Sequence, residues 1–199
     1  MAAGPSPPTC GAKASPWDSN SLDPARIFLA GIGNSGSGHW QARWHAKLPG
    51  SLWVEHADWQ HPDLDAWLSD FETALTQVKG PKLVIAHSLG CLVFSEWATA
   101  HSDQPSSALL VAVPDLTAAV FPKEATGFRS AFDNRLDGQA IMVASHNDPY
   151  ASIDYSRRLA ELWRVKLVDV GNKGHINADS NLDDWSEGWR LLQELTSTG

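Results

Sequence analysis

The chain of 199 residues has few of the residue types that mark several classes of protein. It contains only two cysteines, Cys10 and Cys91, which argues against a small scaffold held together by disulfides. Its eight histidines form no HExxH motif, and no CxxC pair is present. We therefore expect no metal site and no cofactor.

Basic residues and long apolar runs are also scarce. Fifteen Lys and Arg residues stand against 23 Asp and Glu, giving a formal net charge of −8. A nucleic-acid partner would need a clustered basic surface. The single short basic cluster is interpreted as the solvated face of a helix: Arg157, Arg158, Arg164 and Lys166. No apolar run approaches the roughly 20 residues of a membrane span, and the N-terminus has no signal-peptide pattern. We expect a cytoplasmic protein that binds no nucleic acid.

The rest of the composition is typical of a globular protein, with 43% hydrophobic and 19% charged residues. Residues 1–24 are rich in Pro, Gly, Ala and Ser and show no apolar periodicity, which predicts a flexible N-terminal extension. Residues 25–199 then form one domain by length.

Short apolar runs alternate with longer helical patterns along this domain. Strands are predicted at residues 26–30, 52–57, 82–87, 108–113, 139–145 and 165–170, and helices at 39–48, 62–79, 89–100, 152–163 and 183–196. Several strands are apolar along their whole length, which indicates a parallel sheet covered by helices on both faces. The sequence therefore predicts a three-layer α/β fold with a mostly parallel six-stranded sheet. Functional residues are expected at the carboxyl ends of its strands.

One such end carries Ala86-His87-Ser88-Leu89-Gly90, directly between a strand and a helix. A serine in a tight strand-to-helix turn, flanked by small residues, is typical of a nucleophile elbow, although the usual pattern has glycine where Ala86 stands. A serine there can also simply cap the helix, and the pentapeptide alone leaves both interpretations open. His87 is not expected to be the base of Ser88, because adjacent residues leaving a strand point to opposite sides. Its expected role is packing or hydrogen bonding beneath the turn.

A better base follows the last strand. His175 lies in a loop between Gly171 and Asn177 and precedes a helix, the position of the general base in this kind of site. His146 is its rival, but it directly follows the fifth strand, where the acid is expected.

The acid is expected to be Asp148, so that serine, acid and histidine occur in the order Ser88, Asp148, His175. Asp115 is the reserve. Asp169 is weaker, because its place within a strand would turn it into the sheet or its covering helices.

A glycine-rich loop follows the first strand and offers backbone amides to a substrate. We expect the Leu89 amide, at the start of a helix, and the Ile32 amide to form an oxyanion hole. The same loop formally matches a dinucleotide fingerprint, Gly31-x-Gly33-x-x-Gly36, with Glu55 in the place of the acidic residue. That alternative does not explain the three residues Ser88, Asp148 and His175.

These segments together resemble a known family, the small serine hydrolases of the α/β-hydrolase superfamily that include retinoblastoma-binding protein nine. The resemblance covers about residues 26–195 and rests on Gly31 to Ser35, His39-Trp40, Trp44, Asp58-Trp59, Pro62, Trp67, His87 to Gly90, Ser145, Asp148-Pro149 and Gly174 to Ile176. It implies a compact α/β-hydrolase with a minimal lid, in which Ser88 is the nucleophile, His175 the general base and Asp148 its orienting acid. The chain departs from the family pattern at Ala30, where proline is common, and in its long N-terminal extension.

The residues and the resemblance together predict a serine hydrolase that cleaves a small-molecule acyl ester through a covalent acyl-enzyme on Ser88. Four residues near the predicted strand ends are expected to contribute to the substrate pocket, although packing is the commoner role of a tryptophan: Gly33, Asn34, Trp40 and Trp59. The alternative is a non-catalytic interaction protein that keeps the fold and binds partners through its surface or its extension.

Overall fold

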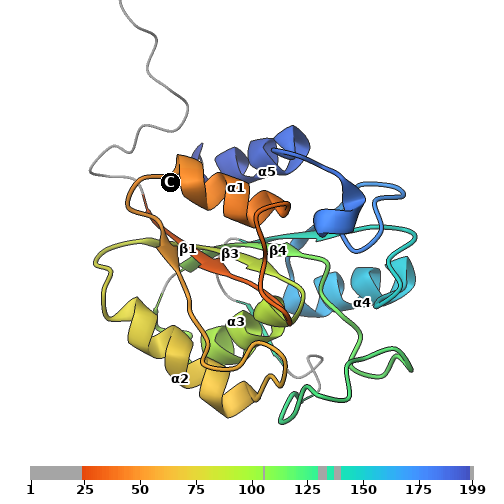
Figure 1. The fold of residues 1–199 in the computed structure, drawn as a ribbon, viewed down its shortest axis with the longest axis horizontal. Coiled ribbons are helices and arrows are strands. Elements are labelled where there is room, and N and C mark those ends of the chain that lie inside the picture. Colours follow the sequence, from red (N-terminus) through yellow and green to blue (C-terminus); the bar gives the residue numbers. More distant parts are fainter. Residues whose placement is uncertain (1–23, 105, 130–133, 137–139, 198–199) are drawn as a thin grey trace, which may run out of the picture.

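The computed structural model describes residues 24–104, 106–129, 134–136 and 140–197 (Figure 1). The predicted N-terminal extension lies outside this part, apart from Pro24. The described residues form one six-stranded sheet with helices on both faces, which confirms the predicted α/β architecture.

All neighbouring strands of the sheet are parallel, and their spatial order is β2-β1-β3-β4-β5-β6. The order reverses between β1 and β3, so loops that leave these two strands diverge and open a crevice at the carboxyl edge of the sheet. The strands span Ala25–Leu29 (β1), Leu52–Trp53 (β2), Lys82–His87 (β3), Ser106–Val111 (β4), Ala140–Ala144 (β5) and Lys166–Asp169 (β6).

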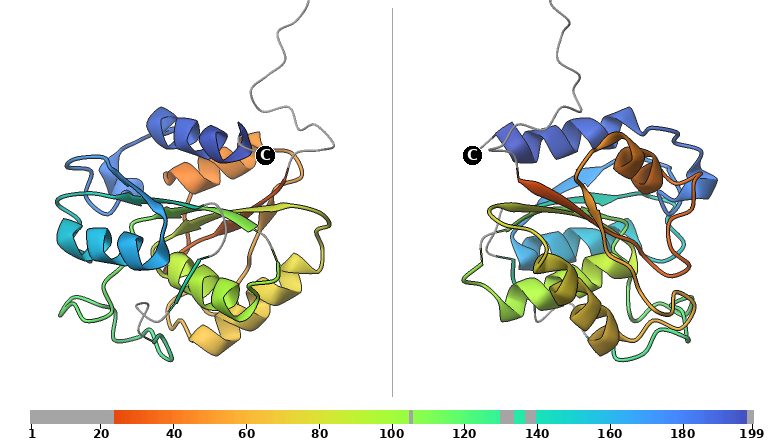
Figure 2. Two further views of the ribbon diagram at one scale, coloured as in Figure 1. Left: turned by 180° about the vertical axis from the view of Figure 1, so that it is seen from behind. Right: turned by 60° about the vertical axis from the view of Figure 1, so that its left-hand side comes forward.

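Helices cover the sheet in two layers (Figures 1 and 2). One face carries α1 (Trp40–Lys47) and α5 (Ser186–Ser197). The other carries α2 (Leu64–Leu75), α3 (Leu89–Ala100) and α4 (Ile153–Trp163). Among the described helices, none is both long and apolar enough to cross a membrane.

Side-chain alternation along the strands divides the interior into two hydrophobic cores. In β3, Val84 and Ala86 face the core under α2, α3 and α4, whereas Leu83 and Ile85 face the core under α1 and α5. This follows from the two-residue period of a strand. Both faces of the central strands are buried, which explains why their sequences read as continuous apolar runs.

Polar side chains determine where several helices begin. Asp63 accepts a hydrogen bond from the Ala66 amide at the start of α2, and Ser152 accepts one from the Tyr155 amide at the start of α4. His39 caps α1 in the same way, its side chain accepting from the Gln41 amide. Each cap satisfies an amide that has no partner within its own helix.

The predicted boundaries were wrong at several elements. The second strand ends at Trp53 instead of residue 57, because it lies at the edge of the sheet and the chain leaves β1 after the Val54 amide has bonded to the Phe28 carbonyl. Helix α2 ends at Leu75, although its apolar period continues to Val78, because the following amides bond three residues back and tighten the turn. Helix α5 starts three residues later than predicted, since Asp183 and Trp185 have positive φ angles.

Candidate active site

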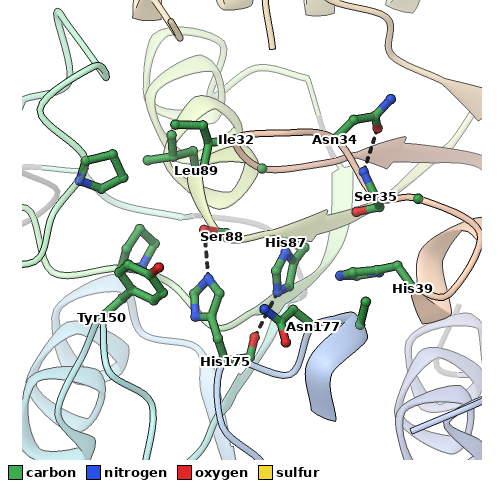
Figure 3. Close-up of a pocket in the computed structure, with 15 residues that line it drawn as sticks. Ile32, Asn34, Ser35, His39, His87, Ser88, Leu89, Tyr150, His175 and Asn177 are labelled. Carbon is green, nitrogen blue, oxygen red and sulfur yellow. Dashed lines mark hydrogen bonds between the residues drawn. The ribbon is translucent and has the colours of Figure 1, made fainter. Parts of the chain in front are cut away.

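Ser88 lies between β3 and α3 in a strained backbone conformation, with φ 53° and ψ −125°. Such a conformation costs about 1–3 kcal/mol in a residue other than glycine. Its side chain makes no capping hydrogen bond to α3. Its Oγ lies 3.0 Å from His175 Nε2 instead (Figure 3). Of the two interpretations that the pentapeptide left open, capping of the helix is therefore wrong.

Two glycines allow the strand and helix to cross closely at Ser88. A Cβ on Gly90 would lie 2.4 Å from the carbonyl oxygen of Leu29, and a Cβ on Gly31 would lie 2.7 Å from the Ser88 Cβ. Neither approach is possible for a larger residue. Ala86, which stands where glycine is usual, is fully buried within β3 and faces the α3 side of the sheet, where its methyl group is accommodated.

His175 and Asp148 complete a hydrogen-bonded chain that begins at Ser88. His175 Nδ1 lies 3.0 Å from each carboxylate oxygen of Asp148, and the Asp148 side chain is 3% exposed. Asp148 Oδ1 also accepts a hydrogen bond from the Tyr150 amide, which fixes the carboxylate. This arrangement orients the imidazole so that Nε2 faces the Ser88 hydroxyl.

The rival residues lie elsewhere. Asp115 accepts hydrogen bonds from the amide and hydroxyl of Thr117, and His146 pairs with Asp169 at the surface. Asp169 is exposed, so the expectation that its side chain would turn into the sheet or its covering helices was wrong. Its pKa is lowered by hydrogen bonds from the Gly171 amide and from His146.

The loop that carries His175 is strained and held by two buried donors. Ile176 is fully buried with a φ of 50°, an unfavourable value for a β-branched residue. His87 Nε2 donates to the carbonyl of His175 at 3.0 Å, and Trp40 Nε1 donates to the carbonyl of Ile176 at 2.8 Å. Packing or hydrogen bonding beneath the serine turn was the role expected for His87, and its bond to the His175 carbonyl confirms this expectation. The bond of Trp40 was not expected. The alternation along β3, which places His87 on the face that α1 covers, is the signal that could have indicated a contact with α1.

Three histidine rings lie side by side beneath Ser88. The centroid of His87 is 4.7 Å from that of His39 and 5.0 Å from that of His175. Burial lowers the pKa of His87 well below its usual range, with further lowering by His39 and His175. Burial, followed by repulsion from His175, lowers the pKa of His39 to about 4. His39 and His87 are consequently neutral at pH 7.

The two expected oxyanion donors lie close to Ser88, Ile32 in the loop after β1 and Leu89 at the start of α3. Ile32 and Leu89 lie beside each other in Figure 3, on the side of Ser88 opposite His175. The next amide after Ile32, that of Gly33, is already bonded to the Trp59 carbonyl at 2.8 Å. Within the part of the chain that the structure describes, the amides of Ile32 and Leu89 donate no hydrogen bond to another protein group. Both amides therefore remain available to an oxyanion.

A cavity of about 220 Å³ opens over Ser88. Of the residues predicted to contribute to a substrate pocket, Asn34 lines it, whereas Gly33, Trp40 and Trp59 are not among the described residues that do. Trp40 is buried in the core under α1 and α5, and Trp59 packs against His56 and Trp67. That part of the prediction was wrong, because position near a strand end does not determine which way an aromatic side chain turns. The lining comprises Gly31, Ile32, Asn34, Ser35, Gly36, His39, His87, Ser88, Leu89, Pro114, Pro122, Tyr150, His175, Asn177 and Ala178.

Across the described ranges, no group of three or more His, Cys, Asp or Glu residues is placed to hold a metal ion. The dinucleotide alternative also lacks its structural context: the glycine-rich loop packs against Ser88 through Gly31, and α1 begins only at Trp40 with His39 as its cap.

The chain has a parallel sheet with a strained serine turn after β3, and a histidine after the last strand contacts that serine. These features, together with the similar solved structures, define an α/β-hydrolase. The chain belongs to the serine hydrolase family, whose model matches residues 26–194. No curated protein matches the chain in sequence.

Solved structures agree with this assignment. The chain is similar to a YdeN-like hydrolase from Pectobacterium atrosepticum, with 28% identity, a TM-score of 0.80 and coverage of 89% of this chain and 92% of that one. It shares its fold with the ydeN gene product of Bacillus subtilis, at 17% identity, a TM-score of 0.68 and coverage of 88% and 100%. It also shares its fold with a monoacylglycerol lipase of Paleococcus ferrophilus, at 11% identity, a TM-score of 0.62 and coverage of 87% and 94%.

Proposed function

We propose that the protein hydrolyses carboxylic esters through a covalent acyl-enzyme, with Ser88 as nucleophile, His175 as general base and Asp148 as the acid that orients it. The observation that carries this proposal is the strained Ser88 whose Oγ lies 3.0 Å from His175 Nε2. If Ser88 only capped α3, neither its strained backbone conformation nor its contact with His175 would be expected.

In this mechanism, His175 Nε2 accepts the Ser88 proton while Oγ bonds to the ester carbonyl carbon. The carbonyl oxygen gains negative charge and accepts hydrogen bonds from the amides of Leu89 and Ile32. His175 then gives the proton to the leaving alkoxide as the carbon–oxygen bond breaks. Water, deprotonated by the same histidine, releases the acid and restores Ser88. Asp148 keeps the proton of the neutral imidazole on Nδ1 and stabilises the imidazolium.

The test is covalent labelling by a fluorophosphonate probe, together with release of p-nitrophenol from p-nitrophenyl butyrate. We expect wild-type protein to be labelled at Ser88, and Ser88→Ala to lose both labelling and turnover by several orders of magnitude. Circular dichroism should show that the variant keeps its fold. Absence of labelling in the wild type, or equal labelling of Ser88→Ala, would contradict the proposal.

The alternative of a non-catalytic interaction protein is supported only by the composition of residues 1–24. Truncation of the chain distinguishes this alternative from the hydrolase proposal. Removal of residues 1–23 should leave ester hydrolysis unchanged, whereas binding of a partner through the extension would be lost.

Three further parts of the proposal rest on the sequence. We propose a cytoplasmic location, independence of metals and cofactors, and a closer relationship to the retinoblastoma-binding protein nine group within the family. Unchanged hydrolysis in the presence of EDTA would support the second of these.

A further inference from the structure

Resting on the proposed function, we propose that the substrate is an uncharged ester with one apolar arm and one arm that carries a neutral hydrogen-bond acceptor, and that this acceptor is bound on the side of His39. Three features of the cavity around Ser88 support this proposal. Its two walls differ in polarity, its lining carries no Lys, Arg, Asp or Glu, and one buried hydrogen-bond donor has no partner.

The two walls of the cavity differ in chemistry. Ile32, Leu89 and Tyr150 lie on one side of Ser88 in Figure 3 and give this side a largely apolar surface. The lining also includes Pro114 and Pro122. The opposite side is polar and carries Asn34, Ser35 and His39. An ester bound at Ser88 has two arms, acyl and alcohol. One arm of a bound ester would therefore contact apolar side chains and the other polar ones.

Charge is missing from both walls. None of the 15 described lining residues is Lys, Arg, Asp or Glu. His39 and His87 are neutral at pH 7, because burial lowers the pKa of each. A carboxylate or ammonium group on the substrate would lose its hydration here and gain no partner of opposite charge, which is costly. The cavity therefore favours uncharged esters.

His39 supplies a specific donor on the polar side. Its Nδ1 accepts the Gln41 amide at 3.1 Å, so the proton of the neutral ring must lie on Nε2. That Nε2 atom is buried without a hydrogen-bond partner. Among the described side chains with such an unpaired buried atom, His39 alone belongs to the lining of the cavity. An acceptor on the substrate would satisfy a donor that the protein leaves unsatisfied.

Several neighbouring polar atoms are already engaged. Ser35 donates its hydroxyl to Gln41 Oε1 at 2.8 Å, and Asn34 Oδ1 accepts the Ser35 amide at 2.7 Å. Asn177 Oδ1 accepts the Asp179 amide at 3.1 Å. These bonds engage the Ser35 hydroxyl and the side-chain oxygens of Asn34 and Asn177, and His39 Nε2 is the buried donor of the described lining that remains without a partner.

Two series of esters test the inference, one for each arm. The acyl series consists of p-nitrophenyl esters of pentanoate, its ether isostere 3-methoxypropanoate, anionic 3-sulfopropanoate and cationic 3-(trimethylammonio)propanoate. The alcohol series consists of butyrate esters of 1-butanol, its isostere 2-methoxyethanol, anionic 2-sulfoethanol and cationic choline. Initial rates give kcat/KM for each ester, by p-nitrophenol release in the first series and by acid release in the second.

In at least one series, we expect the ether ester to exceed its alkyl isostere by about threefold to tenfold, the effect of one hydrogen bond to a buried donor. Both charged esters in that series should be at least about tenfold slower than the ether ester. A charged ester that is the fastest of its series would overturn the inference. Equal rates for the ether and alkyl esters in both series would also overturn it.

A variant of His39 checks the assigned donor. His39→Asn keeps a good capping acceptor for α1 but removes the Nε2 donor, so the ratio of ether to alkyl rates should fall to about one. His39→Ser, which also caps a helix well, serves as the second variant. His45→Asn on the same helix, outside the cavity, is the matched control and should keep the wild-type ratio. An unchanged ratio in both His39 variants would show that the donor is not His39.

Failure of this inference can be separated from failure of the proposed function. If wild-type protein is not labelled by the fluorophosphonate and cleaves no ester, the proposed function fails. If it is labelled at Ser88 and cleaves the alkyl esters without the expected preference, only the inference about the substrate fails.

Discussion

At the scale of single residues, the site depends on how closely two loops approach Ser88. Gly31 leaves β1 directly beside it, and a Cβ there would lie 2.7 Å from the Ser88 Cβ and 3.2 Å from its Oγ. The strained conformation of Ser88 therefore persists only because its neighbours have no side chains that would compete for the same space.

Replacement of Gly31 by alanine tests this packing. We expect Gly31→Ala to displace the Ser88 hydroxyl from His175 and to lower the fluorophosphonate labelling rate about 100-fold, because small misplacements of a reacting group cost that much. Gly36→Ala is the matched control in the same loop, since a Cβ there meets no atom within 4 Å. Equal labelling rates in the two variants would contradict the steric account.

Chain order was enough to predict that the three proposed catalytic side chains lie together. Ser88, Asp148 and His175 follow different strands, and parallel strands bring their carboxyl ends to one edge of the sheet, where the three side chains are hydrogen-bonded. The pocket prediction was wrong for Trp40, because helical spacing reveals that a residue is buried but not which loop or cavity it contacts.

At the scale of elements, the His175 loop is held by donors from α1 and β3. Trp40 and Trp44 are neighbours on α1 and each donates its indole N–H to a buried or partly buried carbonyl, that of Ile176 at 2.8 Å and that of Asp184 at 2.7 Å. Only the first of these carbonyls lies next to His175. Comparison of the two tryptophans therefore separates the positioning of the His175 loop from the general stability of the fold.

Replacement of each tryptophan by phenylalanine separates the two effects. Both variants should lose stability by about 1–3 kcal/mol, because each leaves a carbonyl without its donor. Trp40→Phe should in addition lower kcat about tenfold with little change in KM, since the imidazole of His175 loses its fixed position. Trp44→Phe should keep the wild-type kcat. Chemical denaturation and steady-state kinetics on p-nitrophenyl butyrate measure the two quantities, and an equal fall of kcat in both variants would contradict a specific role for Trp40.

The cap of α1 also makes stability depend on pH. The folded-state pKa of His39 is lowered to about 4, whereas its unfolded value is about 6.5. Between these values the unfolded chain binds a proton that the folded chain does not, so stability falls as pH falls through this window. Burial lowers the pKa of His45, His56 and His87 as well, and these groups add in the same direction.

The unfolding free energy should therefore be highest above about pH 6.5 and should decline toward pH 5, by about 2 kcal/mol from His39 alone. Urea unfolding at pH 7.5, 6.5, 5.5 and 5.0 measures this decline. His39→Asn removes the titrating group but keeps the capping acceptor, so its stability should change less over the same range. A wild-type stability that rises on acidification would be inconsistent with the buried neutral rings.

The predicted bounds were correct for the central strand β3 and for the helix that follows it. The third strand and the third helix match their predicted residues, because both faces of β3 are covered and α3 is almost wholly buried. The larger errors fall at β2, at the ends of α2 and α5, and at β4, which spans Ser106–Val111 instead of the predicted residues 108–113. At these places the chain lies at the edge of the sheet or turns, and Ala112, Asp183 and Trp185 have positive φ angles. Such turns depend on tertiary contacts that a single sequence does not reveal.

At the scale of the whole molecule, the described part of the connection between β4 and β5 forms neither helix nor strand over the cavity, in residues 112–129 and 134–136. This connection contributes Pro114 and Pro122 to the lining, and Thr126 joins it to the start of α2 through the carbonyl of Pro62 and the amide of Leu64. The described segment therefore borders the cavity, and hydrogen bonds tie its path to the start of α2.

The small cavity predicts a preference for short acyl chains. Its volume of about 220 Å³ lies below the roughly 300–1,000 Å³ typical of pockets that enclose larger ligands. Methylene groups beyond the first few would extend over the surface and gain little from burial. We expect kcat/KM for p-nitrophenyl esters to be highest between acetate and hexanoate and to fall at least about tenfold by dodecanoate. In a site that buried every added methylene group, kcat/KM would instead rise with chain length. Ser88→Ala provides the background rate, and substrate concentrations must stay below micelle formation. A steady rise of kcat/KM from acetate to dodecanoate would contradict the shallow site and would require a longer apolar groove than the lining of this cavity supplies.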